Sequence, residues 1–283
     1  MKKGIQCPPG TLRVVRINEH EWVFEYARIR GKVYERLHDA IEHWEAGYVT
    51  FPERTYRQLI NEYPEFIDAY HHLALLLSEK GKQEKAFQMW QEVVSMGLSC
   101  LPPGFEMGRD RLPWGILDNR PFLRAYHGLG LEYLARGHTE KALEIFNNIL
   151  AVNPNDNQGA RALLIDCYFR LNHPQEVLAV CNRYPHDAME QLLYGRVLAL
   201  YQLGRKVEAE RALKEAIEYL PRVGKELIKE RHRKPSSLRP GRITHGGQDQ
   251  AYYYWVEQGK HWQKTPGALE FVRQHLKHQR LLG

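Results

Sequence analysis

The sequence of 283 residues contains 14 histidines and four cysteines, which are common metal ligands. His71 and His72 are adjacent, and adjacent residues on a helix point in different directions. His275 and His278 would share a helix face, but no cysteine or carboxylate lies at a spacing that completes the ligand set. The cysteines form neither a CxxC pair nor a disulfide framework, which favours a reducing, cytoplasmic location. We therefore predict no metal site.

A second candidate for chemistry is the basic stretch from Arg222 to Arg242. It holds eight Lys or Arg residues and two Glu, so its net charge of +6 equals that of the whole chain. Its proline, serine and glycine residues are typical of an exposed connector. Within it, Arg231, Arg233 and Lys234 are possible anion-binding residues, because a dense cationic patch attracts nucleic acid. The stretch contains no aromatic residue to stack on a base, which favours a solvated linker.

Motifs for catalysis and nucleotide binding are missing from the sequence. It contains no GxSxG nucleophile turn, HExxH metal motif, GxxxxGK[ST] phosphate loop or GxGxxG fingerprint. Apolar residues make up 43% and charged residues 26%, as in ordinary globular proteins, and no run of 18 apolar residues could cross a membrane. We expect no enzyme activity, no catalytic residues, no cofactor and no membrane partner.

The elements that would position the candidate side chains are repeats with a period near 34 residues. The clearest copy begins at Leu123. The residue types that define the pattern fall at its positions 4, 7, 8, 11, 15, 20, 24 and 32, which are Tyr126, Leu129, Gly130, Tyr133, Gly137, Ala142, Phe146 and Pro154. The small residues let two antiparallel helices approach closely, and the aromatic rings fill the space between helices. Proline ends the second helix because it has no N–H group. This is the tetratricopeptide repeat (TPR) pattern.

The same frame predicts five repeats, over residues 33–66, 67–100, 123–156, 158–189 and 190–221. Two of them are imperfect: the first has Pro52 where alanine is expected, and the fourth has a short second helix. The predicted fold is therefore all-α, a right-handed superhelical solenoid of TPR helical hairpins spanning residues 33–221.

Three other segments complete the predicted organisation. Residues 1–32 contain two runs rich in β-branched and aromatic residues, which predict a small β-hairpin. Residues 101–122 form a Pro- and Gly-rich insertion that is either functional or a structural plug, and we favour the plug. Residues 222–248 are the predicted basic linker, and residues 249–283 are predicted to form capping helices that close the end of the solenoid.

The sequence resembles the TPR superfamily at the repeats described above. It is more specifically similar to a group of bacterial TPR proteins of unknown function. That similarity lies in GTLRVVR and EWVFEYARI within Gly10–Ile29, LPWGILDNRPFLRAYHGL (Leu112–Leu129), NPNDNQGARALL (Asn153–Leu164) and WQKTPGALEFV (Trp262–Val272). The resemblance covers most of the chain and implies an interaction scaffold rather than an enzyme. The cysteine-rich metal motif of some relatives is missing, and the basic stretch is more charged than the group implies.

In TPR proteins, partners bind in a concave groove lined by the first helix of each repeat. The resemblance assigns six residues to this groove: His71, Arg124, His127, Arg170, Tyr194 and Tyr201. We expect them to contact a protein or peptide partner as one continuous strip. An alternative is that some of them only pack against the hairpin or the capping helices. The predicted function is a cytoplasmic, non-enzymatic adaptor; the alternative is a nucleic-acid-associated regulator that uses residues 222–242.

Overall fold

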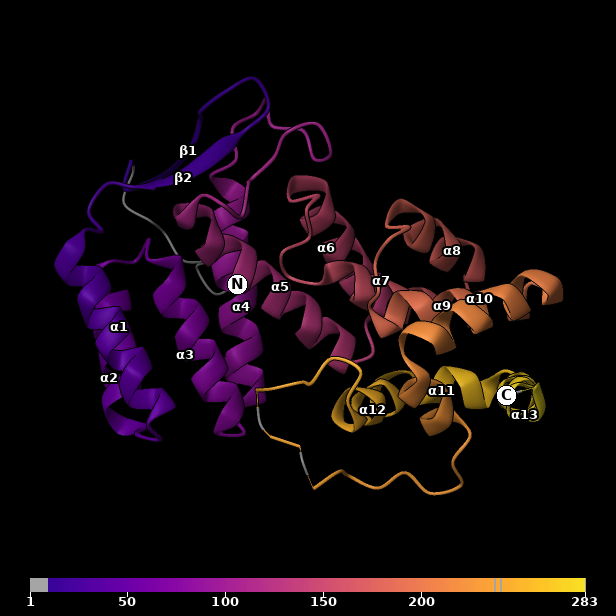
Figure 1. The fold of residues 1–283 in the computed structure, drawn as a ribbon. Coiled ribbons are helices and arrows are strands. Elements are labelled where there is room, and N and C mark those ends of the chain that lie inside the picture. Colours follow the sequence, from indigo (N-terminus) through magenta and orange to yellow (C-terminus); the bar gives the residue numbers. More distant parts are fainter. Residues whose placement is uncertain (1–9, 237, 240, 283) are drawn as a thin grey trace. The chain divides into compact units, whose positions relative to one another are not determined.

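The computed structural model describes residues 10–236, 238, 239 and 241–282, and the side chains among them up to residue 277 (Figure 1). Cys7 and the side chain of His278 therefore lie outside the described part of the chain. The backbone divides into two compact units. The N-terminal unit ends at Ala160, and the C-terminal unit begins at Arg161.

The N-terminal unit contains a β-hairpin followed by antiparallel helix pairs. Strands β1 (Leu12–Arg16) and β2 (Trp22–Tyr26) pair with Val14 opposite Phe24, and their alternating apolar residues are buried on one face. The helix pairs are α1 (Gly31–Glu45) with α2 (Thr50–Glu62), α3 (Ile67–Glu79) with α4 (Gln83–Ser99), and α5 (Arg120–Ala135) with α6 (Thr139–Val152). These ranges confirm an all-α fold of helical hairpins with a small N-terminal β-hairpin.

Glycine sets the geometry of the hairpins at two positions of the repeat. At position 15, which follows the first helix, Gly81, Gly137 and Gly204 have φ angles of +72°, +79° and +72°. The fourth repeat has Asn172 there, with φ of +59°, and asparagine tolerates this left-handed conformation. At position 8, a Cβ on Gly130 would lie 2.7 Å from Cε1 of Phe146, which only a glycine avoids. The two helices of this hairpin therefore touch at Gly130.

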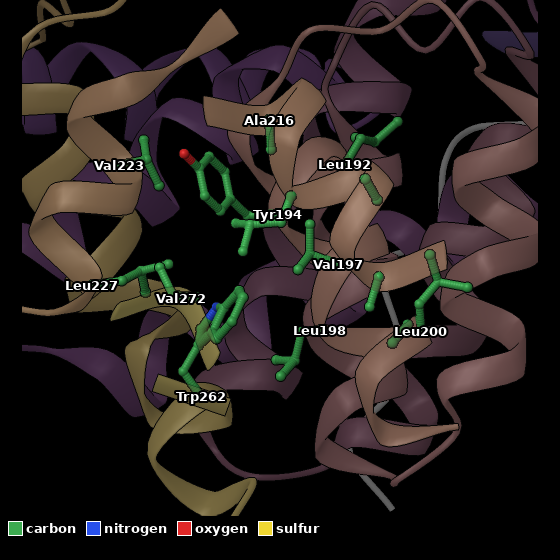
Figure 2. Packing of buried hydrophobic residues seen from close by; sticks show 14 of the residues in the cluster. Leu192, Tyr194, Val197, Leu198, Leu200, Ala216, Val223, Leu227, Trp262 and Val272 are labelled. Carbon is green, nitrogen blue, oxygen red and sulfur yellow. The ribbon is translucent and has the colours of Figure 1, made fainter. Parts of the chain in front are cut away.

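The C-terminal unit consists of two further helix pairs and three additional helices. The pairs are α7 (Ala160–Arg170) with α8 (Pro174–Arg183), and α9 (Glu190–Gln202) with α10 (Lys206–Tyr219); the additional helices are α11 (Pro221–Leu227), α12 (Gln248–Lys264) and α13 (Ala268–Leu282). Figure 2 shows their shared core, in which Tyr194 and Leu198 of α9 lie beside Trp262 of α12 and Val272 of α13.

Helix α11 corrects the predicted linker of residues 222–248. Its residues Val223, Gly224, Glu226 and Leu227 are buried, and Leu227 belongs to the core of the C-terminal unit. Pro221 ends the last repeat, as predicted, but it also occupies the first position of a new helix, where proline is favoured. Val223 and Leu227 are four residues apart and so share one apolar face. The irregular connector therefore begins only after Leu227.

The insertion of residues 101–122 packs onto the β-hairpin. The amide N–H of Trp22 donates to the carbonyl oxygen of Arg111 at 2.9 Å. Asn119, in the short 3₁₀-helix η1 (Leu117–Asn119), accepts from the N–H of Phe24 at 3.1 Å and donates to the carbonyl oxygen of Trp22 at 3.0 Å. Leu112 and Phe122 are fully buried. The insertion thus ties the hairpin to the helices of the N-terminal unit.

Candidate functional site

In each unit, the first helices of the pairs form the face on which the TPR pattern places the groove. We call this face of each unit its inner face: it consists of α1, α3 and α5 in the N-terminal unit, and of α7 and α9 in the C-terminal unit. In the N-terminal unit, side chains link neighbouring first helices directly. Trp44 of α1 donates from Nε1 to Oε2 of Glu79 on α3 at 3.0 Å, and Arg124 of α5 contacts Asp68 of α3. The three helices therefore lie next to one another in sequence order.

Arg124 is held in place by a buried carboxylate. Its Nη2 donates to both oxygens of Asp68, at 2.7 and 2.8 Å, and the Asp68 side chain is only 8% exposed. About a third of the Arg124 side chain remains exposed. Of the predicted groove residues in this unit, Arg124 is the one that combines a partly exposed side chain with a fixed orientation.

His71 and His127 lie deeper than a contact residue of a groove. His71 is buried, and its Nδ1 accepts a hydrogen bond from Nε1 of Trp90 at 3.3 Å. His127 packs against the ring of Phe146. Burial lowers the pKa of both imidazoles, well below the usual range in the case of His71, so both are neutral at pH 7. They support the inner face from beneath.

Three apolar side chains remain accessible on the N-terminal inner face. Leu131 of α5 is 41% exposed, and Leu75 of α3 and Trp44 of α1 are half-buried. Each comes from a different first helix, at position 9 or 12 of its repeat. Together with Glu79 and Arg124, they form a mixed apolar and polar surface, which we call the N-terminal inner patch.

The inner face of the C-terminal unit is covered by α12 and α13. Gln191 donates to Glu257 at 3.4 Å, Gln202 donates to Thr265 at 2.8 Å, and the rings of Tyr201 and Phe271 lie 5.1 Å apart. These contacts use positions 2, 13 and 12 of the repeat, where the TPR pattern places contacts with a partner. The C-terminal helices of this chain therefore take the place of a bound segment in this unit.

The predicted groove residues of the C-terminal unit mainly contact these helices. Tyr194 has no exposed surface; its hydroxyl donates to the carbonyl oxygen of Leu220 at 2.8 Å and accepts from the N–H of Gly224 at 2.9 Å. Tyr201 is partly exposed, with its hydroxyl 3.4 Å from the carbonyl oxygen of Pro266. Tyr194 is thus inaccessible to a partner in this structure, as expected if it packs against the cap.

Arg170 belongs to an ionic cluster around Asp166. Asp166 contacts Nε of Arg170 at 2.7 Å, Nζ of Lys260 at 3.0 Å and Nε2 of His261 at 2.6 Å. Burial raises the pKa of Asp166, but the hydrogen bond from His261 and the charges of Lys260 and Arg170 outweigh it, and the pKa falls to about 2. The cluster joins α7 to α12, and each of the two carboxylate oxygens of Asp166 has at least one partner.

The basic stretch is anchored to α12 at its centre. His232 turns inward, and its ring stacks on Trp255 with centroids 3.6 Å apart and planes at 13°. Its Nδ1 lies 2.9 Å from Oε1 of the buried Glu226. The neighbouring Arg231, Arg233 and Lys234 are exposed. In the described part of the chain, none of these three cations forms an ion pair.

A small pocket lies where the basic stretch meets α12. It has a volume of about 310 Å³ and is lined by His232, Tyr252, Trp255, Val256, Lys260 and Gln263. We call it the aromatic pocket. Residues 222–242 have no Phe, Trp or Tyr, so their composition alone gives no indication of this pocket. The signal that could have been used is the run of aromatic residues from Tyr252 to Trp255.

No group of three or more His, Cys, Asp or Glu side chains among the described residues could hold a metal ion. None of the helices described has both the length and the apolar character needed to span a bilayer.

Cys167 and Cys181 are fully buried, and burial raises the pKa of each thiol to about 12.

The helix pairs and their left-handed turns define a TPR-type repeat protein, and solved structures agree. A TPR protein from Parabacteroides merdae has 15% identity and a TM-score of 0.53, with 89% of this chain and 88% of that chain covered. The MamA protein has 14% identity and a TM-score of 0.50, with 72% and 98% covered. No curated protein matches the sequence.

Residues 43–279 match the family model described as "Transcriptional repressor TCF25". The chain therefore belongs to the TCF25 family. The match extends beyond the repeats, through the basic stretch and α12 to α13. The repeat pattern indicated the TPR fold but gave no indication of this family.

Proposed function

We propose that the protein is a non-enzymatic scaffold that binds a segment of a partner protein on the N-terminal inner patch. TPR-type repeats typically serve as scaffolds for protein partners. The observation that carries the proposal is the exposure of Leu131, with Leu75 and Trp44 also partly exposed on the other first helices of this unit, at positions that TPR proteins use for partner contacts. In the C-terminal unit the same face is filled by α12 and α13, which shows what an occupied inner face looks like.

The chemistry of the patch is suited to recognition. Aromatic and arginine side chains contribute most to binding energy when they are fixed and then desolvated. Trp44 is oriented by its hydrogen bond to Glu79, and Arg124 by its two contacts with Asp68. In this proposal Arg124 contacts the partner, whereas His71 and His127 hold the surface in shape. Arg170, Tyr194 and Tyr201 serve the contact with α12 and α13.

The experiment is affinity capture with the purified full chain as bait, comparing wild type with Leu131→Glu. A charge within the patch should reduce recovery of the main partner at least tenfold, because truncating a true anchor already costs about 2 kcal/mol or more. Val207→Glu is the matched control, since Val207 on α10 is 64% exposed and lies outside the inner face. Equal loss with both variants, or none with Leu131→Glu, contradicts the proposal.

A second candidate function is association with nucleic acid through the basic stretch. Two observations favour it. The family model is described as a transcriptional repressor, and the three exposed cations Arg231, Arg233 and Lys234 lie in a segment with a net charge of +6. Binding that weakens steeply as salt increases is the expected sign of such contacts, because phosphates release counterions when cations replace them.

A further inference from the structure

The basic stretch and the aromatic pocket form one surface of the C-terminal unit. Successive Cα atoms are about 3.8 Å apart, so residues within two positions of His232 have their Cα atoms within about 8 Å of it. Arg231, Arg233 and Lys234 meet this condition, and His232 itself lines the pocket. The backbone of these three exposed cations therefore lies within about 8 Å of a residue that lines the aromatic pocket.

The anchor that holds this arrangement is the His232–Trp255 stack. One face of the Trp255 ring lies against His232, and the ring also lies against Gly259, where a Cβ would come within 2.7 Å of it. His232 therefore occupies one face of the Trp255 ring and closes that face to a ligand. His232 is also fixed, because its side chain is only 14% exposed and contacts Glu226. The connector is thus pinned to α12 rather than freely solvated at this point.

Tyr252 supplies the ring that remains for a ligand. It is half-buried, lies one helical turn before Val256 and lines the pocket together with Lys260 and Gln263. Gln263 offers an amide that can both donate and accept hydrogen bonds, whereas the charge of the 37% exposed Lys260 is already paired with Asp166 at 3.0 Å. The pocket volume is near the lower end of the range of about 300–1,000 Å³ found for small-ligand sites.

We propose that this surface binds single-stranded nucleic acid: one base enters the aromatic pocket and stacks on Tyr252, while the adjoining phosphates contact Arg231, Arg233 and Lys234. The inference rests on the second candidate function and specifies its ligand. A duplex keeps its bases stacked inside, so it could contact the cations but not the pocket. An acidic protein would likewise use only the charges. Base stacking on an aromatic side chain tolerates any sequence, so homopolymers are suitable probes.

The first test measures fluorescence anisotropy of the full chain with labelled oligo-U and oligo-dT of about 15 nucleotides, and with a DNA duplex of similar length. We expect the single strands to bind more tightly than the duplex. Tyr252→Ala should weaken single-strand binding about tenfold, because stacking contributes that much per base, and should leave duplex binding unchanged. Tyr252→Phe keeps the ring and should bind like wild type.

The second test measures how much the charges of Arg231, Arg233 and Lys234 contribute to oligonucleotide binding. The triple variant Arg231→Gln, Arg233→Gln, Lys234→Gln should weaken binding and reduce the slope of log affinity against log salt by about 2. The matched control is Lys206→Gln, Arg211→Gln, Lys214→Gln on α10, which removes the same charge from exposed positions elsewhere in this unit. Circular dichroism melts check that each variant folds, as expected for substitutions of exposed side chains.

The outcomes separate the inference from the function on which it rests. If the triple variant loses binding but Tyr252→Ala does not, nucleic-acid association stands and the single-strand inference is wrong. If the wild type binds no oligonucleotide at low salt, both are wrong. If a poly-glutamate peptide binds as tightly as oligo-U and displaces it, the surface recognises an acidic protein, and the inference is again wrong.

Discussion

In the N-terminal unit, Trp44, Leu75 and Leu131 remain accessible on the first helices of the repeats. In the C-terminal unit, the same face carries Tyr194 and Leu198, which are buried under α12 and α13. Both units follow the same repeat frame, and both place mixed apolar and polar residues on this face. The frame therefore identifies the inner face, but it does not tell whether other helices of the same chain cover that face. That depends on helices located more than 45 residues after α9.

The largest expected effect that tests this contrast comes from tryptophan truncation. Trp262→Ala removes a fully buried ring of α12 and should lower the free energy of unfolding by about 3–5 kcal/mol. Trp44→Ala removes a half-buried ring from the N-terminal inner patch and should cost about 1 kcal/mol or less. Urea unfolding of the two variants measures both values. Equal costs would mean that the N-terminal face is part of a core rather than an accessible surface.

A smaller effect is expected from Arg124 and Arg170, which contact the buried carboxylates of Asp68 and Asp166. Arg124→Gln removes the charge that pairs with Asp68 and leaves only the imidazole of His72 near it, with Nε2 3.7 Å from Oδ1. This change should lower the free energy of unfolding by about 2 kcal/mol. Arg170→Gln leaves Asp166 with Lys260 and His261, so about 1 kcal/mol or less should be lost. The same denaturation assay applies. If Arg170→Gln lowers the free energy of unfolding more than Arg124→Gln does, then Lys260 and His261 of α12 contribute little to stabilising the buried carboxylate of Asp166.

The smallest effect per residue is the response to acid. Burial lowers the pKa of His71, His72 and His127 in the N-terminal unit, so the unfolded chain, with pKa values near 6.5, binds protons first as pH falls. Each histidine should reduce stability by about 1 kcal/mol between pH 7.5 and 5.5. The pKa of Asp166 is lowered to about 2, so its ionised carboxylate stabilises the folded state at neutral pH, and this stabilisation is lost only below about pH 4.

Thermal melts at pH 7.5 and 5.5 check the acid response. His71→Gln removes one of these titrating groups and should reduce the loss of stability between pH 7.5 and 5.5 by about 1 kcal/mol, whatever its effect on stability at pH 7.5. Unchanged pH dependence would show that His71 takes up a proton in the folded state.

The sequence predicted the helix pairs and the local features that define them. Gly137 and Gly204 indicated turns, and Gly130 indicated close packing, because these effects act within one hairpin. The sequence did not predict that Tyr194 is covered, since that contact is made by residues such as Tyr254, 60 positions later in the chain. It also missed the His232–Trp255 stack, because a composition count within residues 222–242 cannot detect a ring supplied by the next helix.

The link between Asn119 and the β-hairpin constrains the order in which the protein can form during translation. The amide of Phe24 must wait for a side chain made 95 residues later. At about 5–20 residues per second, a ribosome takes roughly 5 to 20 s to synthesise that interval. Throughout this time the hairpin has been made, but its docking surface has not. The two strands of the hairpin therefore reach their final contacts only after α1 to α4 have been synthesised.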